Sequence, residues 1–358
     1  MHDLADRDPR LPGMSALLDA ASLSEVVGEP ADLQYLRYKP GTSVLVAYTT
    51  ARGAHWAGVW AGPDKPASAR RRDSSVRQLP GIPWSAGGPA RSDRVLARAV
   101  RSAEHREPSW RGAQVVRHNP GRRLVVRTAD AYAKTAPGRA HAAARNAHVL
   151  RRAGIPTLEP RVVTAHTWAT ASWGDTDLAT IVSTAHAAAA GVALARLHAL
   201  TGDVDLAQGS EPGPRADRAL RALRTALPAV AGRAADLARH LPLSSRRATV
   251  HGDFTADQIL SGPDGRIRVI DLDRMAAGDP ALDLAAFAVE EYLRTGELTL
   301  MTPLFAAYRA AGGIVTEKEW RAATVLCALE RAIEPFRRCH PQWPSLVTSS
   351  VERAGDLR

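Results

Sequence analysis

Two short stretches late in the chain constrain its fold more than any other part of the sequence. The first, VHGDFTADQIL, covers residues 250–260, and the second, RVIDLDRMAAGDPALDLAAF, begins at residue 268. Val269 and Ile270 are typical of a buried strand, so Asp271 and Asp273 fall at its end, where side chains commonly line a cleft. Carboxylates gathered in this way repel one another unless a cation lies among them.

The N-terminal third of the chain has the pattern of β-structure. Residues 31–61 alternate β-branched and aromatic residues around a Pro-Gly turn, and a second set beginning at residue 113 repeats this pattern. Each set predicts a hairpin. Residues 62–94 are rich in Pro, Gly, Ser and Arg and predict a loop, with ARRRD at 69–73 as a solvated part of it.

The rest of the chain has the period of α-helices. The first of them is expected at 139–153, where the apolar period changes from two to about 3.6. One short strand pair near 259–271, with SGPDGR as its turn, interrupts the helical part. The fold class is therefore α+β, a β-rich N-terminal part followed by a mostly helical part. The further helices are expected at 185–200, 215–240, 281–295, 302–311 and 317–339.

Size and composition exclude several functional classes. A chain of 358 residues with 45% apolar content is long enough for two domains. Its net charge is +10, and all but four of its 47 basic residues are Arg. These arginines are scattered rather than gathered in a tract, so no nucleic acid partner is expected. No apolar stretch is long enough to span a membrane, and the acidic, Pro-containing N-terminus favours a cytoplasmic protein.

The carboxylates fit the needs of phosphoryl transfer. Such an enzyme requires a base beside the accepting hydroxyl, ligands for the metal on the nucleotide phosphates, and a cation on those phosphates. Asp253, on a tight His-Gly-Asp turn, is placed to accept the proton. Gln258 and Asp271 can offer oxygen ligands to Mg²⁺, which would also relieve the repulsion between the acids.

The paired motifs HGDFTADQIL and VIDLDRMAAGDPALDLAAF closely resemble the signature of the aminoglycoside phosphotransferase and choline kinase-like family. The resemblance extends over roughly 113–343 and includes LARLH in the helix before the catalytic loop. It implies a protein-kinase-like two-lobed fold with an extra N-terminal cap at 1–105, a small β-rich N-lobe at 106–172 and a larger helical C-lobe at 173–358. It also implies a small-molecule kinase that takes ATP or GTP with Mg²⁺ and phosphorylates a hydroxyl of a small alcohol.

The resemblance assigns roles to individual residues. Asp253 corresponds to the catalytic base, Gln258 and Asp271 to the metal ligands, and Asp273 to an auxiliary acid beside the metal. Lys134, in AYAKTA, stands on the strand before the first helix, where the family places its phosphate-binding lysine. A surface lysine on an edge strand is the alternative interpretation, and Lys39 in RYKPG is the second candidate for the cation.

Other motif residues correspond to nucleotide-binding or bracing positions. The segment 167–181 resembles the hinge, where backbone N–H and C=O groups pair with the nucleotide base. Asp279 and Asp283, in GDPALDLA, resemble residues that brace the catalytic loop and cap a helix. The expected hinge contacts are Ala169, Thr170, Ala171 and Ser172.

Two departures from the family pattern support an alternative. The family usually has Asn where this chain has Gln258, and it places a Glu in the helix that corresponds to 139–153, which here contains no acid. Asn146 stands near that position. A pseudokinase that binds nucleotide without turnover is therefore the rival hypothesis.

The acceptor is the least constrained part of the prediction. Four acids of the helical lobe are candidates to face a polycationic aminoglycoside, or to pair with neighbouring arginines instead. Trp320, Phe336 and Trp343 are candidates to stack on a sugar or other flat ring. The Arg-rich, GC-rich coding style favours an antibiotic substrate, with a nucleoside or sugar-containing antibiotic ahead of an aminoglycoside, and maltose third. The four acids are Glu290, Glu291, Glu330 and Glu334.

Overall fold

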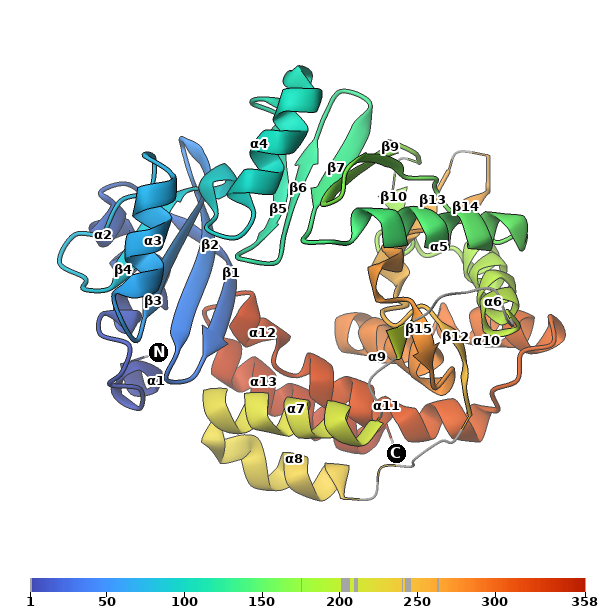
Figure 1. Cartoon of the computed structure of the whole chain (residues 1–358). Helices are drawn as coiled ribbons and strands as arrows, with labels where there is room; N and C mark the ends of the chain where they lie inside the picture. Colours follow the sequence, from blue (N-terminus) through green and yellow to red (C-terminus); the bar gives the residue numbers. More distant parts are fainter. Residues whose placement is uncertain are drawn as a thin grey trace. The chain divides into compact units, whose positions relative to one another are not determined.

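The computed structural model forms two compact units (Figure 1). It describes residues 2–174, 176–200, 207–208, 212–239, 241, 246–262 and 264–357. None of the helices in these ranges is long and apolar enough to cross a membrane. The first unit consists of Met1–His141, Arg161–Thr170 and Glu334–Pro344, and the second of Ala142–Pro160, Ala171–Ile333 and Ser345–Arg358.

The first unit begins with a four-stranded antiparallel sheet in the order β1-β2-β3-β4. The hairpin predicted for 31–61 is confirmed, and its Pro40-Gly41 turn joins the first two strands. Trp56 and Trp60 pack with Ala69 and Ala86 in the core of this sheet. The strands are β1 (Asp32–Lys39), β2 (Ser43–Thr50), β3 (Gly53–Trp60) and β4 (Ser85–Pro89), and the helices beside them are α1 (His2–Asp6), α2 (Ala20–Val27) and α3 (Asp64–Arg72).

The prediction of a loop over 62–94 is wrong, because this segment contains α3 and β4. Pro66 falls in the first turn of α3, where the backbone N–H that proline lacks has no helical partner. Asp64 stands at the positive end of the helix, and the arginines of ARRRD at its negative end, so the charges favour the helix. Arg70 also donates a hydrogen bond of 2.9 Å to the carbonyl of Ser85 in β4.

A second antiparallel-rich sheet completes the first unit, in the order β5-β6-β7-β9-β8. The hairpin predicted from residue 113 is confirmed by the first two of these strands. Helix α4 (Ala97–Arg106) contacts β8, and its residues Val100 and Ala103 share one hydrophobic core with Trp110 and Leu124. The strands are β5 (Gln114–Asn119), β6 (Arg123–Arg127), β7 (Ala131–Thr135), β8 (Arg161–Thr164) and β9 (Thr167–Ala171).

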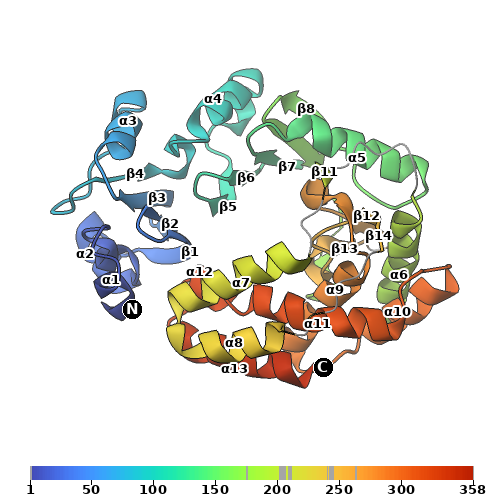
Figure 2. The ribbon, with the colours of Figure 1, turned by 60° about the horizontal axis from the view of Figure 1, so that its bottom comes forward.

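Helices dominate the second unit, as the sequence predicts. Helix α6 packs against α10, and α7 contacts α8 and α11, which Figure 2 shows from below. The single helix predicted over 215–240 is two helices, because Pro228 cannot continue α7. The helices are α5 (Ala140–Arg152), α6 (Thr184–His198), α7 (Pro212–Ala226), α8 (Ala231–Ala238), α9 (Ala281–Thr295), α10 (Met301–Ala310), α11 (Glu317–Arg331) and α13 (Trp343–Asp356).

The C-terminal helices differ from the prediction at one end. The helix predicted over 317–339 ends at Arg331, and a separate short helix α12 (Glu334–Arg337) follows within the first unit. The start of α11 is well defined, because Thr316 and Glu319 form a capping box there. Helix α13 was not predicted.

Two small sheets lie within the second unit. The first contains the predicted strand pair, β13 (Ile259–Ser261) and β14 (Ile267–Val269), with β10 (Thr176–Asp177) beside it. The second was not predicted and contains β12 (Ala248–Val250), β15 (Ala276–Gly278) and β11 (Ala207–Gln208). Strand β12 leads directly into His-Gly-Asp, and β15 follows the Asp271–Arg274 segment, so this second sheet places the two motifs side by side.

Candidate active site

The His-Gly-Asp turn is held by one buried carboxylate. Asp283, on the first turn of α9, accepts hydrogen bonds from the backbone N–H groups of His251 at 2.7 Å and Gly252 at 2.9 Å. A ring nitrogen of His198 lies 3.3 Å from the same carboxylate. The predicted bracing role of Asp283 is confirmed, and Asp279 likewise accepts from the N–H of Ala281 at the start of α9.

The environment of Asp283 favours its ionised form. Burial alone would raise the pKa of this carboxyl, but the hydrogen bond and charge of His198, together with the charge and the backbone N–H of His251, outweigh it. The pKa of Asp283 is therefore lowered. A charged group at the base of the turn fixes the two amides that precede Asp253.

Gly252 allows the turn to pack against the second motif. Its φ is +80°, and a Cβ at this position would lie 2.5 Å from the carbonyl oxygen of Arg274. A side chain therefore cannot be placed there without displacing backbone. The turn consequently brings the half-exposed carboxylate of Asp253 next to the segment that follows Asp271.

The hairpin register brings the backbones of the two predicted metal ligands close to each other. Ile259 pairs with Val269, and the N–H of Ile270 donates to the carbonyl of Gln258 at 3.0 Å, so residue 258 lies across from the residue before Asp271. His251 Nε2 lies 2.9 Å from the carbonyl oxygen of Ile270, which ties the His-Gly-Asp turn to the same point.

Asp271 adopts a backbone conformation that few residues other than glycine occupy. Its φ is 60° and its ψ is 48°, in the left-handed region. Such a conformation costs about 1 kcal/mol or more and is concentrated at functional sites. The strained residue turns the chain at the end of β14, and both Asp271 and Asp273 stay half-buried on the segment that follows.

The donor atoms fit a magnesium ion. Gln258 is buried, and its carboxamide oxygen and the carboxylates of Asp271 and Asp273 are all oxygen donors of the kind that Mg²⁺ prefers. Within the described ranges no three His, Cys, Asp or Glu side chains form a closed metal cluster. Magnesium in phosphoryl-transfer sites is usually held by one or two carboxylates together with substrate phosphates, so a closed cluster is not required.

The residues predicted to contact the nucleotide lie around β7 and β9. Lys134 is half-buried on β7, and its Nζ lies 5.5 Å from the centroid of the Trp168 ring, within cation–π range. Ala169 is buried within β9, while Ala171 is exposed at the end of the strand. The hinge assignment, with Thr170 half-buried and Ser172 exposed beyond the strand, stays a prediction.

Asn146 reaches the second motif from α5. Its side-chain amide donates to the carbonyl of Leu272, at 3.5 Å. Asn146 stands near the position where the family has a Glu. It therefore links α5 to the backbone between Asp271 and Asp273.

These features match a known family. Residues 106–325, more than half of the chain, match the family model described as "Phosphotransferase enzyme family". The chain belongs to this phosphotransferase family. It is therefore a small-molecule phosphotransferase, and the suspected family is confirmed.

Solved structures agree on the fold. Choline kinase LicA from Streptococcus pneumoniae superposes on the phosphotransferase with a TM-score of 0.51 and 14% identity, covering 71% of this chain and 96% of that one. The protein-kinase-like α+β fold is therefore confirmed.

Two further solved structures have TM-scores below 0.5, and curated proteins give no match. A choline/ethanolamine kinase family protein from Mesorhizobium loti has 20% identity and a TM-score of 0.49, over 68% of this chain and 87% of that one. An aminoglycoside phosphotransferase from Streptomyces rimosus has 22% identity and a TM-score of 0.48, over 65% and 98%.

The four acids considered for the acceptor are engaged within the phosphotransferase. Glu290 pairs with Arg294 and Glu334 with Arg337, as the alternative interpretation expected. Glu330 pairs instead with Arg215 of α7, through two hydrogen bonds of 2.9 and 2.6 Å.

Glu291 is engaged by the backbone rather than by an arginine. It is buried and accepts hydrogen bonds from the N–H groups of Leu300 and Met301. Burial raises the pKa of this carboxyl. Each of the four acids thus has at least one partner among the described residues, although Oε2 of Glu290 is buried without a hydrogen-bond partner.

The three aromatic candidates belong to the core. Trp320, Phe336 and Trp343 are each at most 5% exposed. Trp320 packs edge-on against Phe305, and Phe336 packs against Trp343. The expectation that they stack on a substrate ring is wrong, because their faces are already covered.

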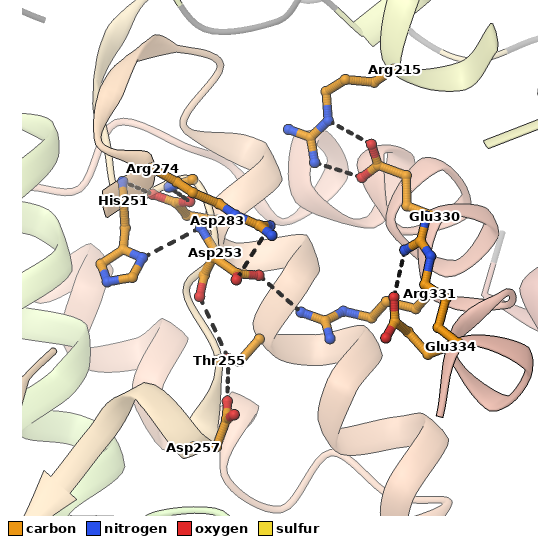
Figure 3. A network of polar contacts seen from close by, with 12 residues as sticks. Arg215, His251, Asp253, Thr255, Asp257, Arg274, Asp283, Glu330, Arg331 and Glu334 are labelled. Atoms are coloured by element: carbon orange, nitrogen blue, oxygen red, sulfur yellow. Dashed lines mark hydrogen bonds and ion pairs between the residues drawn. The ribbon is translucent and has the colours of Figure 1, made fainter. Parts of the chain in front are cut away.

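Two arginines beside Asp253 were missed from the sequence. Arg274 Nη1 lies 3.2 Å from one carboxylate oxygen of Asp253, and Arg331 Nη2 lies 3.7 Å from the other (Figure 3). Arg274 belongs to the second motif, so its proximity follows from the hairpin. Arg331 is far along the chain on α11, and only the packing of that helix brings it to the site.

Proposed function

We propose that this phosphotransferase is a magnesium-dependent kinase that transfers the γ-phosphoryl group of ATP or GTP to a hydroxyl of a small molecule. The observation that carries the proposal is the half-exposed Asp253 carboxylate on a turn whose amides are fixed by buried Asp283. Such a group is positioned to accept the hydroxyl proton as the new P–O bond forms. A cytoplasmic location of the protein, which the sequence leads us to expect, is also part of the proposal.

Each further role follows from the donor chemistry of the site. Gln258 and Asp271 would hold Mg²⁺ through oxygen atoms, and Asp273 would act as an auxiliary acid beside them. When bound, the ion would neutralise charge on the phosphates. Lys134 would bind phosphate oxygens, and the backbone of 169–172 would pair with the nucleotide base.

The acceptor is proposed to be an antibiotic or a sugar-like molecule. The internal pairing of the acids of α9 and α11 speaks against a polycationic aminoglycoside as the first choice. A nucleoside or sugar-containing antibiotic therefore stands first, ahead of an aminoglycoside, and maltose is third. A self-resistance role follows from the first choice.

A nucleotide-binding protein without turnover is the second candidate. It is favoured by α5, whose sequence contains no acid to pair with a lysine, and by the position of Lys134 over the Trp168 ring. The two candidates differ in one measurable property, which is phosphoryl transfer.

The test is a panel of acceptors. Purified protein with Mg²⁺ and either ATP or GTP is incubated with nucleoside antibiotics, aminoglycosides or maltose, and products are identified by mass. A product heavier by one phosphoryl group supports the kinase. Tight Mg·nucleotide binding with no product from any acceptor, and no nucleotide hydrolysis, supports the second candidate instead.

A further inference from the structure

The charge around Asp253 is unusual for a site that receives a cationic substrate. Arg274 and Arg331 both lie within ion-pair distance of this one carboxylate, as Figure 3 shows. Over the ranges that the structure describes, Asp253 is the one acid within ion-pair distance of either guanidinium. Two guanidinium groups therefore lie beside the one carboxylate that is proposed to act as the base.

Arg331 is held in place by the packing of its helix. Helix α11 contacts α7 and α9, and the preceding residue, Glu330, is fixed by a bidentate pair with Arg215. The side chain of Arg331 is only 26% exposed, whereas that of Arg274 is 62% exposed. Arg331 is therefore the more preorganised of the two cations.

The contact between Arg331 and Asp253 leaves hydrogen-bonding capacity unused. At 3.7 Å it is an ion pair but too long for a hydrogen bond. A guanidinium carries five N–H donors in a planar fork, which matches the two oxygens of a carboxylate or phosphate. The donors of Arg331 are thus suited to an anionic group that arrives beside Asp253.

We infer that the acceptor of this enzyme carries an anionic group, a carboxylate or a phosphate, and that Arg331 binds it. This inference rests on the proposed function, because it concerns the molecule whose hydroxyl Asp253 would deprotonate. Arg331 would hold the anion while the hydroxyl takes the place beside Asp253. The same charge repels a polycation, which agrees with the internal pairing of the acids nearby.

The experiment measures binding and does not depend on turnover. Calorimetric titrations in saturating Mg·ADP use matched probes, uridine with uridine 5′-monophosphate and glucose with glucuronate, together with kanamycin as a polycation. We expect wild-type protein to bind the anionic member of at least one pair ten or more times more tightly than its neutral partner. Arg331→Ala should bind that anionic probe at least tenfold more weakly than wild type does. Its affinity for the neutral partner should differ from that of wild type by less than twofold.

Two further variants separate charge recognition from loss of structure. Arg331→Lys keeps the charge without the fork, so it should retain part of the affinity for the anion. Arg321→Ala removes an arginine of the same helix that pairs with Glu317 on the surface, and it should bind every probe as wild type does. Melting temperatures of all variants identify any that fail to fold.

Three results would overturn the assignment. The first is that both members of every pair bind equally or not at all. The second is that kanamycin binds more tightly than the anionic probes, and the third is that Arg331→Ala binds the anion with wild-type affinity. Phosphoryl transfer is scored separately by product mass. A protein that binds the anion through Arg331 but forms no product from any acceptor and hydrolyses no nucleotide contradicts the proposed function and leaves the charge preference standing.

Discussion

At the scale of single residues, spacing along the chain is enough to predict most of the candidate site. Asp253, Gln258 and Asp271 stand close together in sequence on one hairpin and its preceding turn, so local geometry alone brings them together. Arg331 could not be found in this way. Its position depends on the packing of α11, and no local pattern distinguishes it from the other arginines of the helical lobe.

Gln258 provides a test of the metal site. Gln258→Asn keeps the carboxamide, so it should leave the Mg²⁺ dependence of turnover within about threefold of wild type. Gln258→Leu removes the oxygen ligand and should raise the Mg²⁺ concentration needed for half-maximal turnover by roughly tenfold or more. The measurement is a magnesium titration at fixed nucleotide. An unchanged titration curve in the Leu variant would exclude Gln258 from the metal site.

Asp283 gives a prediction for pH dependence. The pKa of its carboxyl is lowered in the folded protein, so the stability it supplies is complete above its unfolded pKa of about 3.9. That stability is lost as pH falls through the folded pKa. Asp283→Asn should cost roughly 3 kcal/mol of unfolding free energy at pH 7, because a carboxylate that accepts three hydrogen bonds is removed.

The same variant should approach wild type in acid. The difference in unfolding free energy should narrow as pH falls below about 4, since Asp283 of the unfolded chain becomes protonated there while the folded carboxylate still resists protonation. Urea unfolding of both proteins between about pH 3 and 7 measures it. A difference that stays constant over this range would show that the charge of Asp283 does not stabilise the fold.

At the scale of elements, the errors of prediction have distinct physical causes. Strands β12 and β15 have three residues each, too short for an alternating pattern to be recognised. Helix α3 was predicted as a loop because of its Pro and Arg content, although its charged residues match the helix dipole at both ends. The helices predicted at 139–153, 185–200, 281–295 and 302–311 carried strong periodicity and the two hairpins carried Pro-Gly turns, and these predictions are confirmed.

The contact of the His-Gly-Asp turn with the second motif can be tested at Gly252. Gly252→Ala places a Cβ 2.5 Å from the carbonyl oxygen of Arg274, and it should cost roughly 3 kcal/mol of stability and reduce turnover at least tenfold. Gly265→Ala is the matched control, because Gly265 has a similar φ of +74° but open space around the Cβ position.

The control isolates the contact from the backbone strain. Gly265→Ala should lower the unfolding free energy by about 1 kcal/mol, because only backbone strain is added, and its turnover should equal that of wild type. Denaturant unfolding and initial rates of both variants provide the comparison. Equal losses of stability and turnover in the two variants would mean that the close approach to Arg274 has no role.

At the scale of the whole molecule, residues before 106 contribute to the core of the family-like part. Leu96 and Val100 pack in one cluster with Trp110, Leu124 and Val163. The sequence resemblance begins near residue 113 and implies only an extra cap for residues 1–105. Contacts between segments far apart in the chain leave little trace in a single sequence, which is why this shared core was not predicted.

The shared core predicts a dependence on Leu96. Leu96→Ala removes a fully buried side chain and should lower the unfolding free energy by about 3 kcal/mol. Val95→Ala, at the neighbouring 41% exposed position, should change it by less than about 0.5 kcal/mol. Denaturant unfolding followed by tryptophan fluorescence measures both. Similar small effects at both positions would indicate that residues before 106 are not part of this core.

The most direct test of the account is the turnover of Asp253→Asn beside that of Asp257→Asn, with Mg·nucleotide affinity measured in both. Asp257 is an exposed acid of the same loop, so its variant should behave as wild type. Asp253→Asn should bind Mg·nucleotide with nearly wild-type affinity and transfer phosphate at least about 100-fold more slowly, because the proton acceptor is lost. Near-normal turnover in Asp253→Asn would contradict the assignment of Asp253 as the base and, with it, the proposed mechanism.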